Sequence, residues 1–257
     1  MDNPKLLLFD LDDTLLRSDK TISPRTLEAL KACREKGFLI GVCTSRAEHN
    51  CLPFLRDLQS DLMIASGGAV VKYRGEYIHT VEFSPEELRA MIALAREICG
   101  ADCEMTVDTL DRHYWNYKVD PNLADASWGE TIWTDYSDFS QKALKLCVQI
   151  FDERHAEVLK NRLPQCDILR FTGSCWHKFT RKDATKEQAI RKACSLCTID
   201  LKNVTAFGDD VPDIGMLKLC GTGIAMGNAL PAVKEAADLV IGSCDADGIG
   251  EYLEGLF

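Results

Sequence analysis

Residues 5–16, KLLLFDLDDTLL, contain the pattern from which the fold can be predicted. The apolar run 6–9 is followed at once by the carboxylates of Asp10, Asp12 and Asp13. A short apolar run bounded by polar residues is typical of a strand buried on both faces of a parallel sheet. Open α/β sheets bind their ligands at the carboxyl ends of such strands, where these carboxylates fall. Closely spaced acids repel one another, and a hard cation such as Mg²⁺, which prefers oxygen ligands, would relieve that repulsion.

Length and composition exclude several classes of protein. A chain of 257 residues is expected to form one large domain or two smaller ones. The net charge is −10 and no Lys/Arg run exceeds two residues, which argues against nucleic-acid and anionic-membrane partners. No apolar run is long enough to span a membrane, and acids follow the start too closely for a secretory signal. We therefore expect a cytoplasmic protein.

The 12 cysteines do not suggest a disulfide framework. Most lie in apolar or helical surroundings, and in a reducing compartment they are expected to be buried small hydrophobic residues. Cys194 and Cys197 form a single C-x-x-C pair without a second pair at zinc-finger spacing. A core or surface role is favoured for this pair over a metal site.

The residues after the first strand predict a βαβ unit. Ser23 suits a helix N-cap and Pro24 the first helical position, while Gly37 ends the predicted helix. The apolar run 38–43, FLIGVC, is a second buried strand, so the sheet is expected to be parallel with a right-handed crossover. A helix over 48–58, a strand over 62–65 and a two-stranded ribbon over 70–73 and 77–81 are expected to follow.

The pattern changes between residues 82 and 182. Ser84 and Glu87 predict a capping box at the start of a helix that runs to Cys99. Short strands are expected at 103–107, 113–118, 143–151, 167–173 and 175–181, a helix at 154–163, and an irregular segment at 122–136. This is an α+β insertion with an antiparallel sheet. It concentrates aromatic and histidine side chains, some of which we expect to line a pocket: His113, Tyr114, Trp115, Trp128, Trp133, Trp176 and His177.

The parallel pattern returns after residue 182. Lys186 lies near the start of a predicted helix, where the helix dipole disfavours a cation. Such a lysine fits better if it points toward a phosphate and an aspartate. The apolar strand 204–207 then ends in the acidic sequence Gly208-Asp209-Asp210-Val211-Pro212-Asp213.

Four segments together resemble the motifs of the haloacid dehalogenase (HAD) superfamily, in its Cof-like phosphatase branch with a type II cap. They are D-x-D-D-T-L-L at Asp10, Thr44-Ser45-Arg46 after the second strand, the segment around Lys186, and G-D-D-V-P-D at Asp209. The resemblance covers nearly the whole chain. It implies an α/β fold with a Rossmann-like parallel sheet core, divided as core 1–81, α+β cap 82–182 and core 183–257.

The resemblance also implies roles for individual residues. Asp10 is expected to attack phosphorus and form an aspartyl-phosphate, and Asp12 to act as general acid and base. Thr44 and Lys186 are expected to stabilise the transferring phosphoryl group, with Ser45 and Arg46 as further substrate contacts. Mg²⁺ is expected to be held by Asp10, the backbone carbonyl of Asp12, Asp209 and nearby Asp213.

The expected activity is Mg²⁺-dependent hydrolysis of small phosphate monoesters, such as sugar or cofactor phosphates. A phosphomutase of the phosphomannomutase type is an alternative enzyme. A catalytically weak binding or regulatory member is the alternative from another class, because four positions depart from the branch pattern. These are Ser45 for Gly, Gly67 for Asn, Glu187 for Gly, and Pro212 for Asn. The sequence does not identify the phosphoester, the cap residues that contact it, or the oligomeric state.

Overall fold

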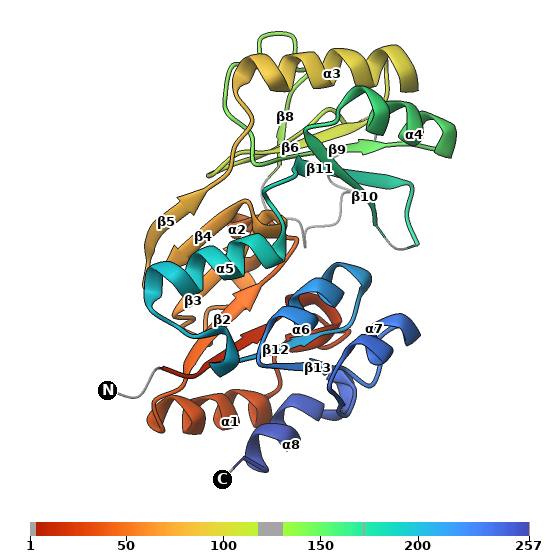
Figure 1. Cartoon of the computed structure of the whole chain (residues 1–257). Coiled ribbons are helices and arrows are strands. Elements are labelled where there is room, and N and C mark those ends of the chain that lie inside the picture. Colours follow the sequence, from red (N-terminus) through yellow and green to blue (C-terminus); the bar gives the residue numbers. More distant parts are fainter. Residues whose placement is uncertain (1–3, 118–130, 172, 257) are drawn as a thin grey trace.

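The computed structural model describes residues 4–117, 131–171 and 173–256, which build two sheets, each with its own helices (Figure 1). One sheet has eight strands and the other six. The six-stranded sheet is formed from the middle of the chain and lies over the eight-stranded one. The described helices include none that is both long and apolar enough to cross a membrane.

The larger sheet is parallel except at one edge, which confirms the predicted α/β core. The first strand lies in its interior because all four of its residues are buried. Strands β4 and β5 extend the sheet in the antiparallel sense. In sheet order the strands are β14 (Leu239–Val240), β13 (Thr222–Ala225), β12 (Val204–Gly208), β1 (Leu6–Phe9), β2 (Leu39–Cys43), β3 (Leu62–Ala65), β4 (Val70–Tyr73) and β5 (Glu76–Thr80).

In the described part of the chain six helices accompany this sheet, and side chains cap the starts of two of them. The Ser23 hydroxyl accepts a hydrogen bond from the Thr26 N–H at the start of the first helix, and Thr185 does the same for Gln188. The helices are α1 (Pro24–Glu35), α2 (Glu48–Cys51), α5 (Lys186–Cys197), α6 (Ile214–Leu219), α7 (Pro231–Ala236) and α8 (Gly248–Glu254).

The smaller sheet is mostly antiparallel, with two helices packed on one face (Figure 1). The capping box predicted at Ser84 and Glu87 begins the longer helix. In sheet order the strands are β10 (Cys166–Arg170), β11 (Trp176–Arg181), β9 (Lys145–Gln149), β6 (Met105–Asp108), β7 (His113–Trp115) and β8 (Thr131–Trp133). The helices are α3 (Pro85–Cys99) and α4 (Glu153–Arg162).

Alternation along these strands decides which side chains face the core sheet. In β9, Leu146 and Val148 belong to the apolar cluster under α3 and α4. Successive strand residues point to opposite faces, so Lys145 and Cys147 point away from the helices. Pairing between strands puts the following on that same face: Thr106, Asp108, His113, Trp115, Trp176 and Lys178.

Several predicted boundaries were wrong. The helix expected over 48–58 ends at Cys51, and only a short helical turn, Leu52–Phe54, follows, because Pro53 lacks an N–H and disfavours helix at the residue before it. Residues 131–133, expected to be irregular, pair with β7 as a strand. Trp128 and Lys118 lie outside the described residues.

Smaller shifts affect the cap strands and the last motif. The strand expected over 143–151 is confined to Lys145–Gln149, and the one expected over 103–107 is Met105–Asp108. The last motif contains a helical turn, Val211–Asp213, for which Asp210 is the N-cap, and α6 follows it. We propose that the domain limits follow the two sheets, at 1–81, 82–182 and 183–257.

Candidate active site

The carboxyl ends of three neighbouring strands bring the predicted site residues together. Asp10 follows β1, Thr44 follows β2, and Asp209 follows β12, and these strands are adjacent in the order β12-β1-β2. A cavity of 190 Å³ opens there. It is lined by all eight of the predicted site residues: Asp10, Asp12, Thr44, Ser45, Arg46, Lys186, Asp209 and Asp213.

Lys186 joins two of these carboxylates. Its Nζ donates to Asp10 Oδ1 and to Asp213 Oδ1, each at 2.6 Å, and its side chain is only 4% exposed. Burial opposes the charge on Lys186, but Asp10 and Asp213 hold its pKa well above the usual value. Lys186 is the first residue of α5, so the helix start supplies a fixed position for this ammonium group.

Three carboxylates at this edge are crowded enough to call for a cation. Asp10, Asp209 and Asp213 each offer a ligand oxygen, all within 4.8 Å of one another. Burial raises the pKa of the Asp209 carboxyl to about 7, with Asp213, Asp13 and Asp210 adding to the effect against the Thr14 hydroxyl. Burial likewise raises the pKa of Asp10, with Asp213 adding and Lys186 opposing. An all-oxygen group with mutual repulsion fits a hard divalent cation.

The carboxylate of Asp12 lies apart from this group. It accepts hydrogen bonds from Arg46 Nε at 2.6 Å and Nη2 at 2.8 Å, and from Lys20 Nζ at 3.0 Å. Burial opposes ionisation of Asp12, but Arg46 and Lys20 lower its pKa. Arg46, expected to contact substrate, is therefore occupied by Asp12 and by the ring of Phe54.

Thr44 and Ser45 connect the core site to the cap. Thr44 is buried, and its hydroxyl accepts the N–H of Arg46 at 3.1 Å. The carbonyl of Ser45 accepts a hydrogen bond from Nζ of Lys145, which comes from the cap strand β9, at 3.2 Å. The six-stranded sheet therefore contacts the core directly beside this cavity.

A second cavity of 380 Å³ lies against the core-facing side of the cap sheet. It shares Lys145 and Phe171 with the first cavity, so the two adjoin. Its aromatic walls are Trp115, Trp176 and Phe171, and the two indoles meet edge to face with centroids 6.0 Å apart. The indole N–H of Trp115 is buried without a partner among the described residues.

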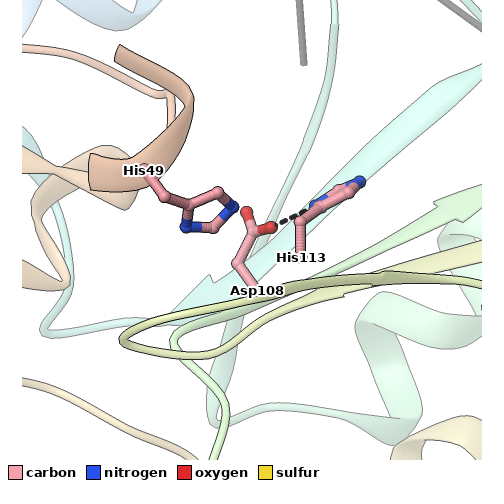
Figure 2. A group of neighbouring side chains, drawn as sticks. All are labelled: His49, Asp108 and His113. Atoms are coloured by element: carbon pink, nitrogen blue, oxygen red, sulfur yellow. Dashed lines mark hydrogen bonds and ion pairs between the residues drawn. The ribbon is translucent and has the colours of Figure 1, made fainter. Parts of the chain in front are cut away.

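Polar side chains also line this cavity, among them Asp108, His113 and Lys145. Asp108 lies between His49 of α2 and His113 of β7 (Figure 2), and its Oδ1 is 2.5 Å from His113 Nδ1. Nζ of Lys145 is 2.6 Å from Asp108 Oδ2. Burial opposes the charge on Asp108, but Lys145 and His113 hold its pKa well below the usual range. His49, Asp108 and His113 offer ligand atoms within 4.8 Å of one another, yet Lys145 already balances the carboxylate.

Sequence analysis found only part of this second cavity. His113, Trp115 and Trp176 line it as expected. Tyr114 packs against Phe139, Trp133 is exposed, and the buried His177 does not line the cavity. Asp108 and Lys145 were missed. The one available signal was a lysine at the start of an otherwise apolar strand, since a buried charge requires a partner.

The comparisons with known proteins agree on one protein family. The model for haloacid dehalogenase-like hydrolases matches residues 7–253. The pyridoxal phosphate phosphatase of Escherichia coli (strain K12) is 26% identical, with 97% of each chain covered. A 5-amino-6-(5-phospho-D-ribitylamino)uracil phosphatase of Bacillus subtilis (strain 168) is 23% identical, over 99% of this chain and 98% of its own. A solved HAD subclass IIB sugar phosphatase superposes with a TM-score of 0.85 at 26% identity, covering 98% of both chains.

Proposed function

Because the chain belongs to the haloacid dehalogenase-like hydrolases, we propose that it hydrolyses phosphate monoesters of small metabolites through a phosphorylated Asp10. The observation that carries the proposal is the placement of Lys186 between Asp10 and Asp213, beside Asp209, at the ends of adjacent strands. This arrangement brings together a carboxylate nucleophile, a fixed ammonium group and a cluster of carboxylates suited to bind a metal ion. Phosphoryl transfer requires these groups and little else from the protein.

Mg²⁺ is the cofactor that we propose for this site. Asp10, Asp209 and the backbone carbonyl of Asp12 would hold it, with Asp213 nearby. When bound, it would neutralise charge on the phosphoryl oxygens. The crowding of Asp10, Asp209 and Asp213 within 4.8 Å supports this assignment.

In the first proposed step, a carboxylate oxygen of Asp10 attacks phosphorus. The bond from phosphorus to the ester oxygen breaks, and the leaving alkoxide takes a proton from Asp12. Lys186 and the Thr44 hydroxyl are the groups placed to stabilise the oxygens of the transferring phosphoryl group. Because Arg46 and Lys20 favour the ionised form of Asp12, the first step requires Asp12 to take up a proton and to leave Arg46.

In the second proposed step, water attacks the phosphorus of the phosphorylated Asp10. Asp12, now ionised, removes a proton from this water, and the bond from Asp10 oxygen to phosphorus breaks. Inorganic phosphate leaves and the Asp10 carboxylate is regenerated. The ion pair between Asp12 and Arg46 therefore favours the protonation state that the second step needs.

The second cavity, called the cap cavity below, supports the proposal that the leaving group of the substrate is small and partly apolar. Its volume of 380 Å³ suits a sugar or a cofactor-sized ring, and Trp115, Trp176 and Phe171 offer flat faces. Asn50, Asp108, His113 and Lys145 offer hydrogen bonds to hydroxyl or carbonyl groups. Sugar phosphates, and phosphates of ring-containing cofactors, are the substrate classes that we propose, in a protein acting in the cytoplasm.

A screen for phosphate release tests this proposal. The purified protein with added Mg²⁺ is incubated with a panel of sugar, polyol, nucleotide and pyridoxal or flavin phosphates. We expect release of inorganic phosphate from several small esters. Transfer of phosphate within a sugar, dependent on a sugar bisphosphate, would indicate the mutase instead. Absence of turnover with every ester would contradict the proposed function.

A further inference from the structure

The side-chain ammonium group of Lys178, a residue of the cap, lies directly over the backbone of Gly67. A Cβ atom built on Gly67 would lie 2.8 Å from Nζ of Lys178, and 3.7 Å from its Cε. Gly67 also has a left-handed backbone, with φ of 69°. The N–H of Gly67 donates to the carbonyl of Thr44 at 3.0 Å, and Thr44 lines the candidate catalytic cavity. The absent side chain at Gly67 leaves the room that the Lys178 ammonium occupies.

The register of the cap sheet explains why Lys178 points toward the core. Lys178 lies opposite Cys147 in the pairing of β11 with β9, and Cys147 lines the cap cavity. Phe179, the next residue, belongs to the apolar cluster under the helices. Lys178 therefore projects from the face that carries Lys145 and Trp176, and it extends to Gly67.

No carboxylate among the described residues forms an ion pair with the Lys178 ammonium. The residue is 5% exposed, and its side-chain ammonium forms no hydrogen bond or ion pair with residues 4–117, 131–171 or 173–256. Burial, together with the nearby ammonium groups of Lys145 and Lys186, lowers its pKa to about 8. Those two lysines have carboxylate partners, in Asp108 and in Asp10 with Asp213. A buried ammonium without a partner is costly, so this position calls for an anion.

We propose that Lys178 is a substrate-binding residue whose ammonium group, lodged over Gly67, binds an anionic oxygen of the phosphate ester. This inference rests on the proposed function, since the ester is the anion that the site is built to receive. The anionic oxygen belongs either to the transferring phosphoryl group or to a second anionic group on the leaving part of the substrate. Gly67 is required for this arrangement, because any side chain at residue 67 would displace the Lys178 ammonium group.

The test uses Lys178→Met, Gly67→Asn and the double variant, with kcat and KM measured on each ester that the wild type hydrolyses. Inorganic phosphate binding is measured in parallel by calorimetry, so that a binding result is obtained independently of turnover. Lys178→Met keeps the length and apolar stem of the side chain. The matched control is Gly75→Asn, because Gly75 also has a positive φ, of 89°, but has open space at its Cβ position.

We expect Lys178→Met to lower kcat/KM by about tenfold to a hundredfold, chiefly through KM, as for a lost hydrogen bond to a charged group. Gly67→Asn should produce a comparable loss alone and little further loss in the Lys178→Met background. Gly75→Asn should leave both constants unchanged. If kcat/KM falls on every ester and inorganic phosphate binds more weakly, Lys178 binds the transferring phosphoryl group. If kcat/KM falls only on esters that carry a second anionic group, Lys178 binds that second group.

A purely structural role for Lys178 gives a different result. Lys178→Met would then change the unfolding free energy while leaving KM on all esters, and phosphate affinity, within about twofold of wild type. That result overturns the inference and leaves the proposed function intact. Additive effects of the two substitutions would also contradict it. A wild type that neither hydrolyses any ester nor binds phosphate overturns the proposed function, and this inference with it.

Discussion

The guanidinium group of Arg46 holds the carboxylate of Asp12 through two hydrogen bonds, from Nε at 2.6 Å and from Nη2 at 2.8 Å. Arg46 is 6% exposed, whereas the Asp12 side chain is about a third exposed. The pair therefore joins a buried cation to a carboxylate that faces the cavity. In the proposed mechanism the same carboxylate handles both protons, so this contact must open and re-form during turnover.

Asp12→Asn should lower kcat by about 10²- to 10⁴-fold, as for loss of a general acid and base, with a smaller effect on KM. Asp13→Asn is a matched control, because Asp13 is the adjacent acid and its side chain is half exposed. We expect the control to keep kcat within about threefold of wild type. Steady-state phosphate release compares the two. Equal losses in both variants would show a general effect of negative charge in this loop.

Removal of divalent metal should abolish phosphate release. Without a cation, the carboxylates of Asp10, Asp209 and Asp213 repel one another and the phosphate. Protein treated with a chelator and desalted should regain activity on addition of Mg²⁺, and should unfold at a higher temperature with Mg²⁺ than without it. Asp209→Asn should weaken the Mg²⁺ dependence of both readouts. Full activity in the presence of excess chelator would contradict the metal assignment.

Asp108→Asn should lower the unfolding free energy by about 3 kcal/mol, because it leaves the buried Lys145 ammonium without a counter-charge. Adding Lys145→Met should recover part of that loss. Glu153→Gln breaks the exposed pair with Arg170 and should cost less than about 1 kcal/mol. Urea unfolding gives the three values.

The same ion pair gives a pH dependence of stability. The pKa of Asp108 is held below its usual range, so its contribution should be complete above about pH 5 and lost on acidification below that. The acid-induced loss should therefore be smaller in Asp108→Asn than in wild type. An identical pH profile for both proteins would show that Asp108 does not contribute in this way.

Gly215→Ala should destabilise the protein by about 1–3 kcal/mol through overpacking. A Cβ atom at residue 215 would overlap the Glu187 carboxylate, with Oε1 as the nearest atom and Cδ as the next. The double variant with Glu187→Ala should recover most of the loss. Gly255→Ala, where the nearest atom is 3.4 Å away, is the control and should be nearly neutral. Thermal unfolding midpoints compare them, and a fully neutral Gly215→Ala would show that Glu187 moves freely.

The core and its acidic edge were predictable because local sequence determines them. The apolar run before Asp10 predicts a buried strand, and the carboxyl ends of parallel strands must meet at one edge. Asp10, Thr44 and Asp209 then come together by topology alone. The segment 204–213 is a further example, since its strand and its capped turn are both local features.

The cap cavity was not predictable in the same way. Lys145 and Lys178 read as ordinary strand lysines until the register of β9 and β11 places both on the core-facing side. The meaning of Gly67 depends on Lys178, which is more than a hundred positions later in the chain. Arg46 was expected at the substrate, but its bond to Asp12 depends on how two loops meet. Such contacts are tertiary, and no periodicity or capping rule encodes them.

Phosphorylation of Asp10 is the central claim, and acid quenching of a single turnover tests it most directly. Protein with Mg²⁺ and an ester labelled in its phosphoryl group is quenched in acid, and protein-bound label is counted for wild type, Asp10→Asn and the Asp13→Asn control. We predict label on wild type and on the control, and none on Asp10→Asn, whose steady-state turnover should fall by about 10³-fold or more. Near-normal turnover of Asp10→Asn, or label retained at the wild-type level in that variant, would contradict the account.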